Sequence, residues 1–366
     1  MKDLIFIGGG HAQLESLKNT EKYRSLGLDV KLISPNAFTY YSGMGPGLLG
    51  GLYEPEETRF NVKKLVESGE GTFIQDKVVK IDPVNQKLYL ESKKEVKYDL
   101  ISIDVGSVIF SENLHIEGDK FIPVKPIENL IKIKSSIISG NLKDLSNIII
   151  VGGGPAGIEI ATNLNQLKKT INKKINIKII SDTKILESYP SKVREIALQS
   201  LNKKGIQVYE SKKVEKILDN KIYLDDGTSE ECDLGILATG VKPVNILDDS
   251  GIPQDQDGSM IVNSHLQSIK YENIFGGGDC INMKDNNLDK VGVYAVRENP
   301  ILYKNLLNFV KGKPLIQYTP QENYLLILNM GNKKGLAWKG NTVLKGKMMF
   351  YLKNFIDKRF MRKFQL

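Results

Sequence analysis

The chain has 366 residues, which is too long for one small core and predicts two or three domains. Its 41% hydrophobic and 26% charged residues are ordinary values for a globular protein and argue against disorder. The net charge of +8 is concentrated in residues 345–366, which carry seven Lys or Arg against Asp357, so the charge excludes a broad nucleic-acid surface and favours one local anionic partner.

The N-terminus runs directly into an apolar strand, Leu4 to Ile7, which leaves no room for a signal peptide. No apolar run reaches the ~18 residues that a spanning helix needs, so we expect a cytoplasmic protein. The two cysteines, Cys232 and Cys280, lack C-x-x-C spacing, and this predicts neither a disulfide framework nor a redox-active dithiol. No histidine or cysteine spacing indicates a metal site.

One pattern occurs twice along the chain. Each copy begins with an apolar strand that runs into three glycines, continues with a helix and a second strand, and closes with an Asp-led apolar strand that ends in glycine. Continuous apolar strands alternating with helices predict parallel sheets buried on both faces. We therefore predict an α/β fold with two Rossmann-like three-layer domains and a small C-terminal module. The paired segments are 4–10 and 148–154, 30–34 and 177–181, and 98–106 and 232–240.

The first domain is predicted to be discontinuous. Residues 122–126 hold two prolines and suit a crossover linker. The glycine cluster at 275–279 has no strand–helix nucleotide turn behind it, so the chain should return to the first unit after Gly240. The predicted domains are residues 1–120 with 252–305, residues 121–251, and residues 306–366, the last being a C-terminal module with a basic tail.

The second glycine turn, residues 152–157, matches G-x-G-x-x-G between a strand and a helix. Gly152 permits the tight turn, Gly154 lets a pyrophosphate approach the backbone, and Gly157 lets helix and strand pack closely. After the second strand of this unit, Asp182 is placed to bind the 2′-hydroxyl of a ribose. No arginine stands ready for a 2′-phosphate, which favours NADH over NADPH, although Lys184 is near.

The first glycine turn is incomplete, because Gln13 occupies the third glycine position. Close packing is therefore relaxed there or achieved differently, and Ser34 replaces the expected acidic residue at the end of the second strand. Downstream, Asp279 follows a glycine-rich strand end and suits contact with a ribityl chain; an ordinary helix N-cap is the alternative. A helix near 291–301 would direct its positive end at the N1/O2 edge of a flavin.

These motifs resemble the two-dinucleotide-binding flavoproteins of the pyridine nucleotide-disulfide oxidoreductase superfamily. Within it, the chain is similar to FAD-containing NADH dehydrogenase-like proteins, a group related to the domain fused to selenophosphate synthase. The resemblance covers nearly the whole chain and is most specific at residues 41–44 (Tyr-Ser-Gly-Met) and 292–297 (Gly-Val-Tyr-Ala-Val-Arg). The predicted FAD site comprises Gly8, Gly10, His11, Ala12, Ser34, Ser42, Gly43, Val78, Gly106, Gly278, Asp279 and Tyr294. The predicted NADH site comprises Gly152, Gly154, Pro155, Ala156, Gly157, Ser181, Asp182, Thr239 and Gly240.

The resemblance also implies two catalytic residues. Glu159 matches the glutamate that faces nicotinamide and flavin in type II NADH dehydrogenases; alternatively, it is a first-turn acid stabilised by the helix dipole. Lys290 matches a lysine near the flavin pyrimidine edge in relatives of sulfide:quinone oxidoreductase; alternatively, it is a solvated surface lysine. The chain departs from both families, since it lacks paired cysteines for thiol chemistry and carries Ala295-Val-Arg-Glu298 where a quinone-site pattern is expected.

The tail carries an apolar stripe at helical spacing, Met348, Leu352, Phe355 and Ile356, among basic residues. This pattern fits an interfacial helix on anionic lipid or a helix that packs on a partner subunit, including a homodimer. We predict an FAD-dependent NAD(P)H oxidoreductase that passes hydride from NADH to FAD and on to a membrane quinone, peripheral on the inner face of the cell membrane. A soluble reductase of selenium or sulfur metabolism and a non-enzymatic flavin-binding protein remain as alternatives.

Overall fold

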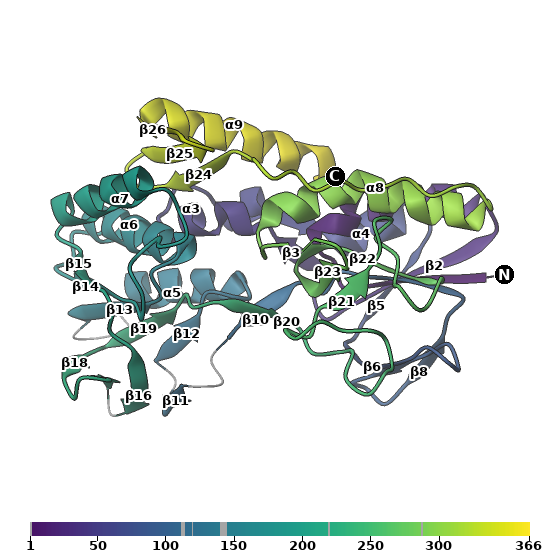
Figure 1. Cartoon of the computed structure of the whole chain (residues 1–366), viewed down its shortest axis with the longest axis horizontal. Coiled ribbons are helices and arrows are strands. Elements are labelled where there is room, and N and C mark those ends of the chain that lie inside the picture. Colours follow the sequence, from purple (N-terminus) through teal and green to yellow (C-terminus); the bar gives the residue numbers. More distant parts are fainter. Residues whose placement is uncertain (1, 111–113, 119, 140–144, 219, 287) are drawn as a thin grey trace.

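The computed structural model describes residues 2–110, 114–118, 120–139, 145–218, 220–286 and 288–366. Two five-stranded parallel sheets form its two units (Figure 1), in the orders β22-β9-β1-β2-β5 and β12-β19-β13-β14-β15. In each sheet the central strand is the apolar one that leads into a glycine turn, and the α/β prediction is confirmed. The first sheet consists of β1 (Lys2–Ile7), β2 (Leu28–Ser34), β5 (Thr72–Gln75), β9 (Leu100–Ile103) and β22 (Ile274–Gly276), and the second of β12 (Phe121–Pro123), β13 (Asn147–Val151), β14 (Asn176–Ile180), β15 (Gln207–Tyr209) and β19 (Leu234–Leu237).

The chain crosses between the units and returns. Strand β10 (Ser107–Ile109) pairs antiparallel with β20 (Val241–Pro243), and this two-stranded ribbon joins the units in Figure 1. After β20 the chain comes back to the first sheet, where β22 pairs parallel with β9. The first crossing lies at β10, before the boundary expected at residue 120, because β11 (His115–Ile116) already pairs with a strand of the second unit.

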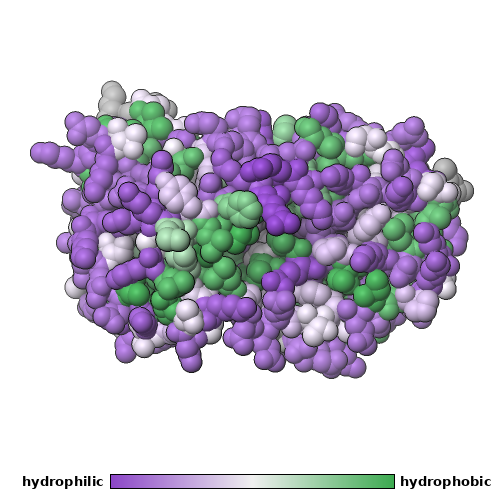
Figure 2. Space-filling view, turned by 90° about the horizontal axis from the view of Figure 1, so that it is seen from above, coloured by the Kyte–Doolittle hydropathy of each residue, from purple (hydrophilic) through white to green (hydrophobic). Residues whose placement is uncertain are grey.

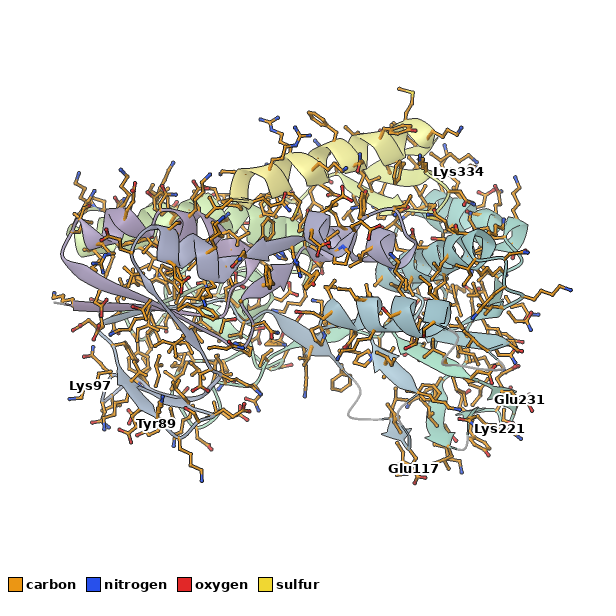
Figure 3. All side chains as sticks on the ribbon, turned by 180° about the vertical axis from the view of Figure 1, so that it is seen from behind. Tyr89, Lys97, Glu117, Lys221, Glu231 and Lys334 are labelled. Carbon is orange, nitrogen blue, oxygen red and sulfur yellow. The ribbon has the colours of Figure 1, made fainter. Side chains whose placement is uncertain are left out.

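Each unit also carries a three-stranded antiparallel meander, and the two meanders match in detail. In both, the register shifts within the first strand, at Val78/Lys80 in one and at Val214/Lys216 in the other. Figure 3 shows them at the lower edge of the molecule, with Tyr89 and Lys97 on the first and Lys221 and Glu231 on the second. The duplication therefore extends beyond the glycine turns. The strands are β6 (Val78–Asp82), β7 (Lys87–Leu90) and β8 (Glu95–Lys97), and β16 (Val214–Leu218), β17 (Lys221–Leu224) and β18 (Ser229–Glu231).

The helices after the two glycine turns differ. In the second unit, α6 (Pro155–Thr170) starts directly at the turn, with proline at its first position, where a missing N–H costs nothing. In the first unit, a short 3₁₀ turn (His11–Gln13) and α1 (Leu14–Lys18) take its place. The other elements are α2 (Thr20–Arg24), α3 (Gly45–Leu49), α4 (Val62–Ser68), α5 (Glu128–Ser139), α7 (Ser191–Lys203), α8 (Gly292–Val310), β3 (Phe38–Tyr40), β4 (Arg59–Asn61), β21 (Met260–Val262) and β23 (Ile281–Met283).

The C-terminal module lies across both units (Figure 1). It consists of the antiparallel strands β24 (Leu326–Asn329), β25 (Gly335–Lys339) and β26 (Thr342–Gly346), followed by α9 (Lys347–Phe364). The boundary expected at residue 306 falls inside α8, because this helix continues to Val310 and its last turn, with Leu307, Phe309 and Val310, still packs on the core of the first unit. The far end of α9 is anchored in the first unit, where the Phe364 ring packs edge-on against Phe60. No helix in the described ranges is long and apolar enough to cross a bilayer.

Candidate functional site: two nucleotide cavities and a buried polar cluster

The second cavity, of about 720 Å³, lies at the carboxyl ends of β13 and β14, where parallel sheets of this kind bind ligands. Among the predicted NADH residues, Gly157 does not line it, because it packs against the turn instead. Two lysines without a predicted role, Lys212 and Lys213, also line the cavity, and so does Lys184. The predicted residues that line it are Gly152, Gly154, Pro155, Ala156, Ser181, Asp182, Thr239 and Gly240.

The three glycines of this turn differ in what surrounds them. Gly152 has φ +127°, a conformation that L residues rarely adopt. A Cβ on Gly157 would overlap the carbonyl oxygen of Gly152, so this glycine permits the close packing of helix and strand. A Cβ on Gly154 would meet no atom of the described residues within 4 Å, so its open side faces space that a ligand can enter. These features fit a dinucleotide whose phosphates lie on the N-terminus of α6.

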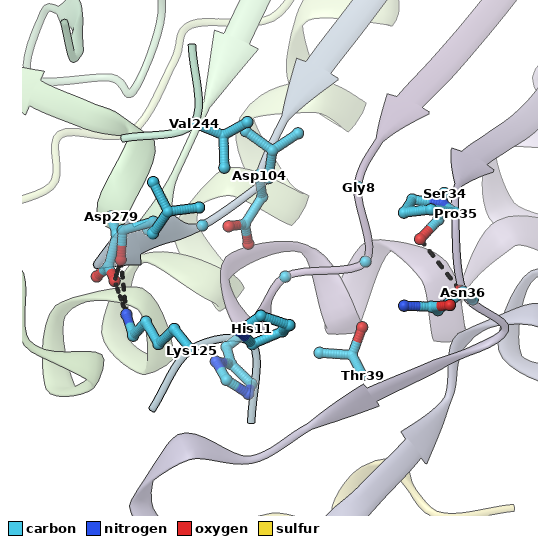
Figure 4. Close-up of a pocket in the computed structure, with 18 of the residues that line it drawn as sticks. Gly8, His11, Ser34, Pro35, Asn36, Thr39, Asp104, Lys125, Val244 and Asp279 are labelled. Atoms are coloured by element: carbon cyan, nitrogen blue, oxygen red, sulfur yellow. Dashed lines mark hydrogen bonds and ion pairs between the residues drawn. The ribbon is translucent and has the colours of Figure 1, made fainter. Parts of the chain in front are cut away.

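The first cavity, of about 620 Å³, lies between the first glycine turn, the crossover segment and the start of α8 (Figure 4). Three predicted FAD residues do not line it. Ala12 is buried beneath the turn, Gly43 lies one residue beyond the lining Ser42, and the Tyr294 ring packs on Tyr324 with centroids 5.4 Å apart. The predicted residues that line it are Gly8, Gly10, His11, Ser34, Ser42, Val78, Gly106, Gly278 and Asp279, together with Lys290.

Gln13 explains how the first turn closes without its third glycine. Its side chain is fully buried, and its amide nitrogen donates to the carbonyls of Ile7 and Gly8. Its amide oxygen accepts from the Ser102 hydroxyl at 3.0 Å. The glutamine thus satisfies backbone groups at the end of β1, and close packing is achieved differently, one of the two expectations from the sequence.

Replacing Gln13 with leucine should therefore destabilise the first unit. The substitution preserves the approximate volume but leaves buried carbonyl and hydroxyl groups without partners, at a cost of about 1–3 kcal/mol. We expect a lower denaturant midpoint and a lower flavin content per chain. A Gln199→Leu variant on the exposed face of α7 is the control. Unchanged stability in the Gln13 variant would show that these hydrogen bonds do not support the turn.

Asp279 is held by two partners inside the first cavity. Its carboxylate accepts from Lys125 Nζ at 2.7 Å and from Ser107 Oγ at 2.5 Å (Figure 4). Burial alone would raise the pKa of Asp279, but Lys125 and Ser107 bring it below its usual value. An ionised carboxylate with free lone pairs suits a polyol chain. Sequence reasoning missed Lys125 as a site residue, because 154 positions separate it from Asp279 and it lies in an apparent linker.

His11 faces the first cavity from the glycine turn. Rings of Tyr41, Phe60 and Phe360 surround it at centroid distances of 5.4, 6.1 and 6.3 Å. Burial lowers the pKa of His11 to about 4, so the ring is neutral at physiological pH. Its Nε2 is buried and has no hydrogen-bond partner in the described part of the chain. A buried, unpartnered polar atom on a cavity wall fits a site that a ligand completes.

The two residues predicted to be catalytic lie in different surroundings. Lys290 lines the first cavity, but its ammonium donates to Ser259 Oγ at 2.6 Å and to the Ile281 carbonyl at 2.8 Å, and it pairs with Asp257 at 3.3 Å. Its side chain is 12% exposed, which differs from a solvated surface lysine. Glu159 lines neither cavity. It belongs to a separate polar cluster under α9.

That cluster joins segments from all three parts of the chain. The Glu159 carboxylate accepts from the Asn329 N–H at 2.6 Å. Lys353 of α9 donates to Asp357 and to the Gly43 carbonyl, each at 2.8 Å. Burial raises the pKa of Glu159 to about 7, although the Lys353 charge and the Asn329 N–H oppose the shift. The cluster therefore holds a carboxyl group that can gain or lose a proton near neutral pH, close to the wall of the first cavity.

Both cysteines lie in the core, as predicted. Burial raises the pKa of Cys232 to about 12, and burial likewise raises the pKa of Cys280. The thiolate, which is the reactive form, is therefore scarce at physiological pH.

Comparison with known protein families agrees with the fold, the paired cavities and the glycine turns. Residues 2–300 match the sequence pattern of the pyridine nucleotide-disulphide oxidoreductase family. The chain belongs to this family. This membership confirms the predicted enzyme class, an NAD(P)H oxidoreductase, and its cofactors, FAD and a nicotinamide dinucleotide.

Individual members of the pyridine nucleotide-disulphide oxidoreductase family resemble most of the chain. Ferroptosis suppressor protein 1 of Taeniopygia guttata is 30% identical over 73% of this chain and 71% of its own length. A probable NADH dehydrogenase of Dictyostelium discoideum is 26% identical over 85% of this chain and 74% of its own. The sulfide:quinone oxidoreductase of Aquifex aeolicus superimposes with a TM-score of 0.81 at 18% identity, covering 100% of this chain and 92% of that one, and shows the shared fold.

Proposed function

We propose that this oxidoreductase takes hydride from NADH and delivers the electrons to a quinone at a membrane surface. FAD, when bound, supplies the redox chemistry that links NADH to the quinone. The names of its relatives include an NADH dehydrogenase and, among structures of the same fold, a quinone oxidoreductase. The second cavity would hold the nicotinamide nucleotide, and the first would hold FAD with Asp279 toward the ribityl chain.

The observation that carries the quinone assignment is the position of the polar cluster. Lys353 bonds to the Gly43 carbonyl, next to Ser42 on the wall of the first cavity, and it belongs to α9, whose outer face is exposed. A quinone pairs a polar, proton-accepting ring with an apolar tail. The buried carboxyl and ammonium groups under α9 supply a polar environment, and the exposed apolar face of the same helix supplies an apolar one. Glu159 and Asp357 would hold and move the protons that quinone reduction requires.

The outer face of α9 supports a membrane surface as the place of reaction. Met348 is 78% exposed and Phe355 is 59% exposed, which is unusual for apolar side chains of this size. Seen from the α9 side, apolar residues gather into a patch with hydrophilic residues around it (Figure 2). The inner side of the same helix packs Phe360 and Phe364 against Phe60. The stripe predicted from the sequence is thus the outward face, which suits an interfacial helix with basic flanks.

NADH is the proposed donor because Asp182, which follows β14 on the wall of the second cavity, would accept from the 2′-hydroxyl of a ribose. A competition between NADH and NADPH tests this choice. If NADPH reduces the enzyme faster, Lys184, Lys212 and Lys213 would instead be assigned to a 2′-phosphate.

The sulfur-metabolism alternative gains no support from the cysteines, because both are buried with raised pKa values.

Anaerobic titration of the purified yellow protein with NADH, followed by a screen of acceptors, tests the proposed function. We expect NADH to bleach the visible flavin absorbance and a short-chain quinone to restore it faster than dioxygen or a disulfide. Bleaching without reoxidation by any quinone would refute the acceptor and leave the donor half-reaction standing. Failure to bleach would refute the donor.

A charge placed on the apolar face of α9 should abolish membrane binding. We expect the double variant Met348→Glu/Phe355→Glu to lose sedimentation with anionic vesicles, because two carboxylates would have to enter the lipid interface. Reduction of a water-soluble acceptor should stay at the wild-type rate. Val84→Glu/Ile138→Glu is the control matched in charge, since Val84 is 79% and Ile138 51% exposed and neither belongs to α9. Equal loss of vesicle binding in the control would assign the effect to net charge.

A further inference from the structure

Asp104 occupies an unusual place in the first cavity. It follows the buried strand β9, and its side chain lies between the glycine turn near Gly8 and the segment that carries Asp279 (Figure 4). The residue is 2% exposed, yet it belongs to the cavity wall. Its Oδ2 accepts from the Ala12 N–H at 2.7 Å. That amide is in the first turn after the glycines, where dinucleotide phosphates accept hydrogen bonds in this class of fold.

Two glycines make room for this carboxyl group. A Cβ on Gly10 would overlap the Asp104 carboxylate, and a Cβ on Gly278 would lie 2.6 Å from Asp104 Oδ1. The side of Gly10 that a Cβ would occupy therefore faces an acid, so the absence of a side chain at this predicted FAD residue makes room for Asp104. At the corresponding Gly154 of the second unit, no atom in the described part of the chain lies within 4 Å of the position of a Cβ. A dinucleotide's phosphates would therefore meet an acid beside the first glycine turn and open space beside the second.

The surroundings of Asp104 disfavour its ionised form. Burial raises the pKa of Asp104 well above its usual value, the Ala12 and Gln13 N–H groups oppose this, and the charges of Glu298 and Asp279 add to it. None of these groups is a cation. Lys125 is committed to Asp279, Lys290 to Asp257 and Ser259, and His11 is neutral. Glu298 itself accepts from the Gly278 N–H at 2.6 Å. A pyrophosphate on the same amides would add further negative charge.

We propose that Asp104 is a protonated acid that donates a hydrogen bond to the FAD pyrophosphate, so that the flavoprotein holds its cofactor together with a proton. The inference rests on the assignment of FAD to the first cavity. A neutral carboxylic acid supplies a donor to the phosphate oxygens, whereas a carboxylate at the same place repels them. FAD affinity should be highest at low pH and fall about tenfold for each pH unit above the pKa of Asp104 in the unloaded protein.

The test measures the dissociation constant of FAD from the full chain, by the fluorescence of released FAD, from mildly acidic to alkaline pH. Wild type should lose FAD progressively on the alkaline side. Asp104→Asn keeps an N–H donor without a titrating proton and should bind FAD with an affinity that varies little with pH. Asp76→Asn is the matched control, a partly exposed acid on the wall of the same cavity, and should keep the wild-type slope.

A pH slope that persists in Asp104→Asn, or a wild-type affinity without any slope, would overturn the proposal. If the asparagine variant does not fold, calorimetry of FAD binding to the wild type in buffers of different ionisation enthalpy decides instead. Proton uptake on binding at alkaline pH is expected, and its absence refutes the inference. A chain that binds no flavin at any pH would refute the cofactor assignment rather than the role of Asp104.

Discussion

Replacing Gly154 with leucine is expected to weaken nicotinamide nucleotide binding strongly while the fold and the flavin content stay at wild-type levels. No atom of the described residues lies within 4 Å of the position that a Cβ would take, so the added side chain starts in open space. It would occupy the space through which phosphates reach the N-terminus of α6. Loss of about 3 kcal/mol of phosphate interaction corresponds to a roughly 100-fold weaker affinity. Titration calorimetry with NADH measures the effect.

The matched control adds the same side chain to the same domain. Lys192 is exposed at the start of α7 and lines neither cavity, so Lys192→Leu should bind NADH like the wild type. Thermal unfolding and the visible flavin spectrum of both variants report on the fold. Wild-type NADH affinity in Gly154→Leu would show that the nucleotide binds elsewhere, and the second cavity would lose its assignment.

Replacing Glu159 with glutamine should slow the reoxidation of the enzyme by quinone about 100-fold and leave its reduction by NADH nearly unchanged. The Glu159 carboxyl lies in the cluster with Lys353 and outside the nucleotide cavities, so it can deliver protons to an acceptor without touching the donor. Removing a positioned general acid typically costs two or more orders of magnitude. Stopped-flow measurement of each half-reaction separates the two steps.

The pH dependence provides a second sign of this role. Because the pKa of Glu159 is raised to about 7, the carboxyl is protonated below that pH and ionised above it. The quinone step of the wild type should therefore slow as pH rises through about 7, and Glu159→Gln should lose this inflection. Glu195→Gln is the control, because Glu195 lies on the exposed face of α7. Equal slowing of both half-reactions would place Glu159 beside the nicotinamide, as the family resemblance suggested.

Local patterns in the sequence were sufficient to predict the architecture of two similar units. An apolar strand that ends in glycine and leads into a helix specifies its own backbone conformation, because the turn geometry and the burial pattern depend on neighbouring residues. The positions of β1, β13 and the turn at Gly152 follow from this, and so does the return of the chain to the first sheet at β22. Cys232 and Cys280 were correctly assigned to the core, since neither has a partner at a useful spacing.

The chemistry around those turns was decided by tertiary structure. Lys125 reaches Asp279 across 154 positions, and Tyr41 reaches Asp357 across 316. Such contacts depend on how two sheets, a crossover ribbon and α9 close on one another, and no periodicity along the chain encodes that closure. The burial of Asp104 could not be predicted for the same reason. In the sequence it is the residue that ends an apolar strand, and it is buried because the segments of Gly10 and Gly278 pack around it. Neighbouring residues in the chain were therefore enough to predict two dinucleotide sites, because each glycine turn is a local structure. The side chains around each site come from distant segments, so they follow only from how those segments pack.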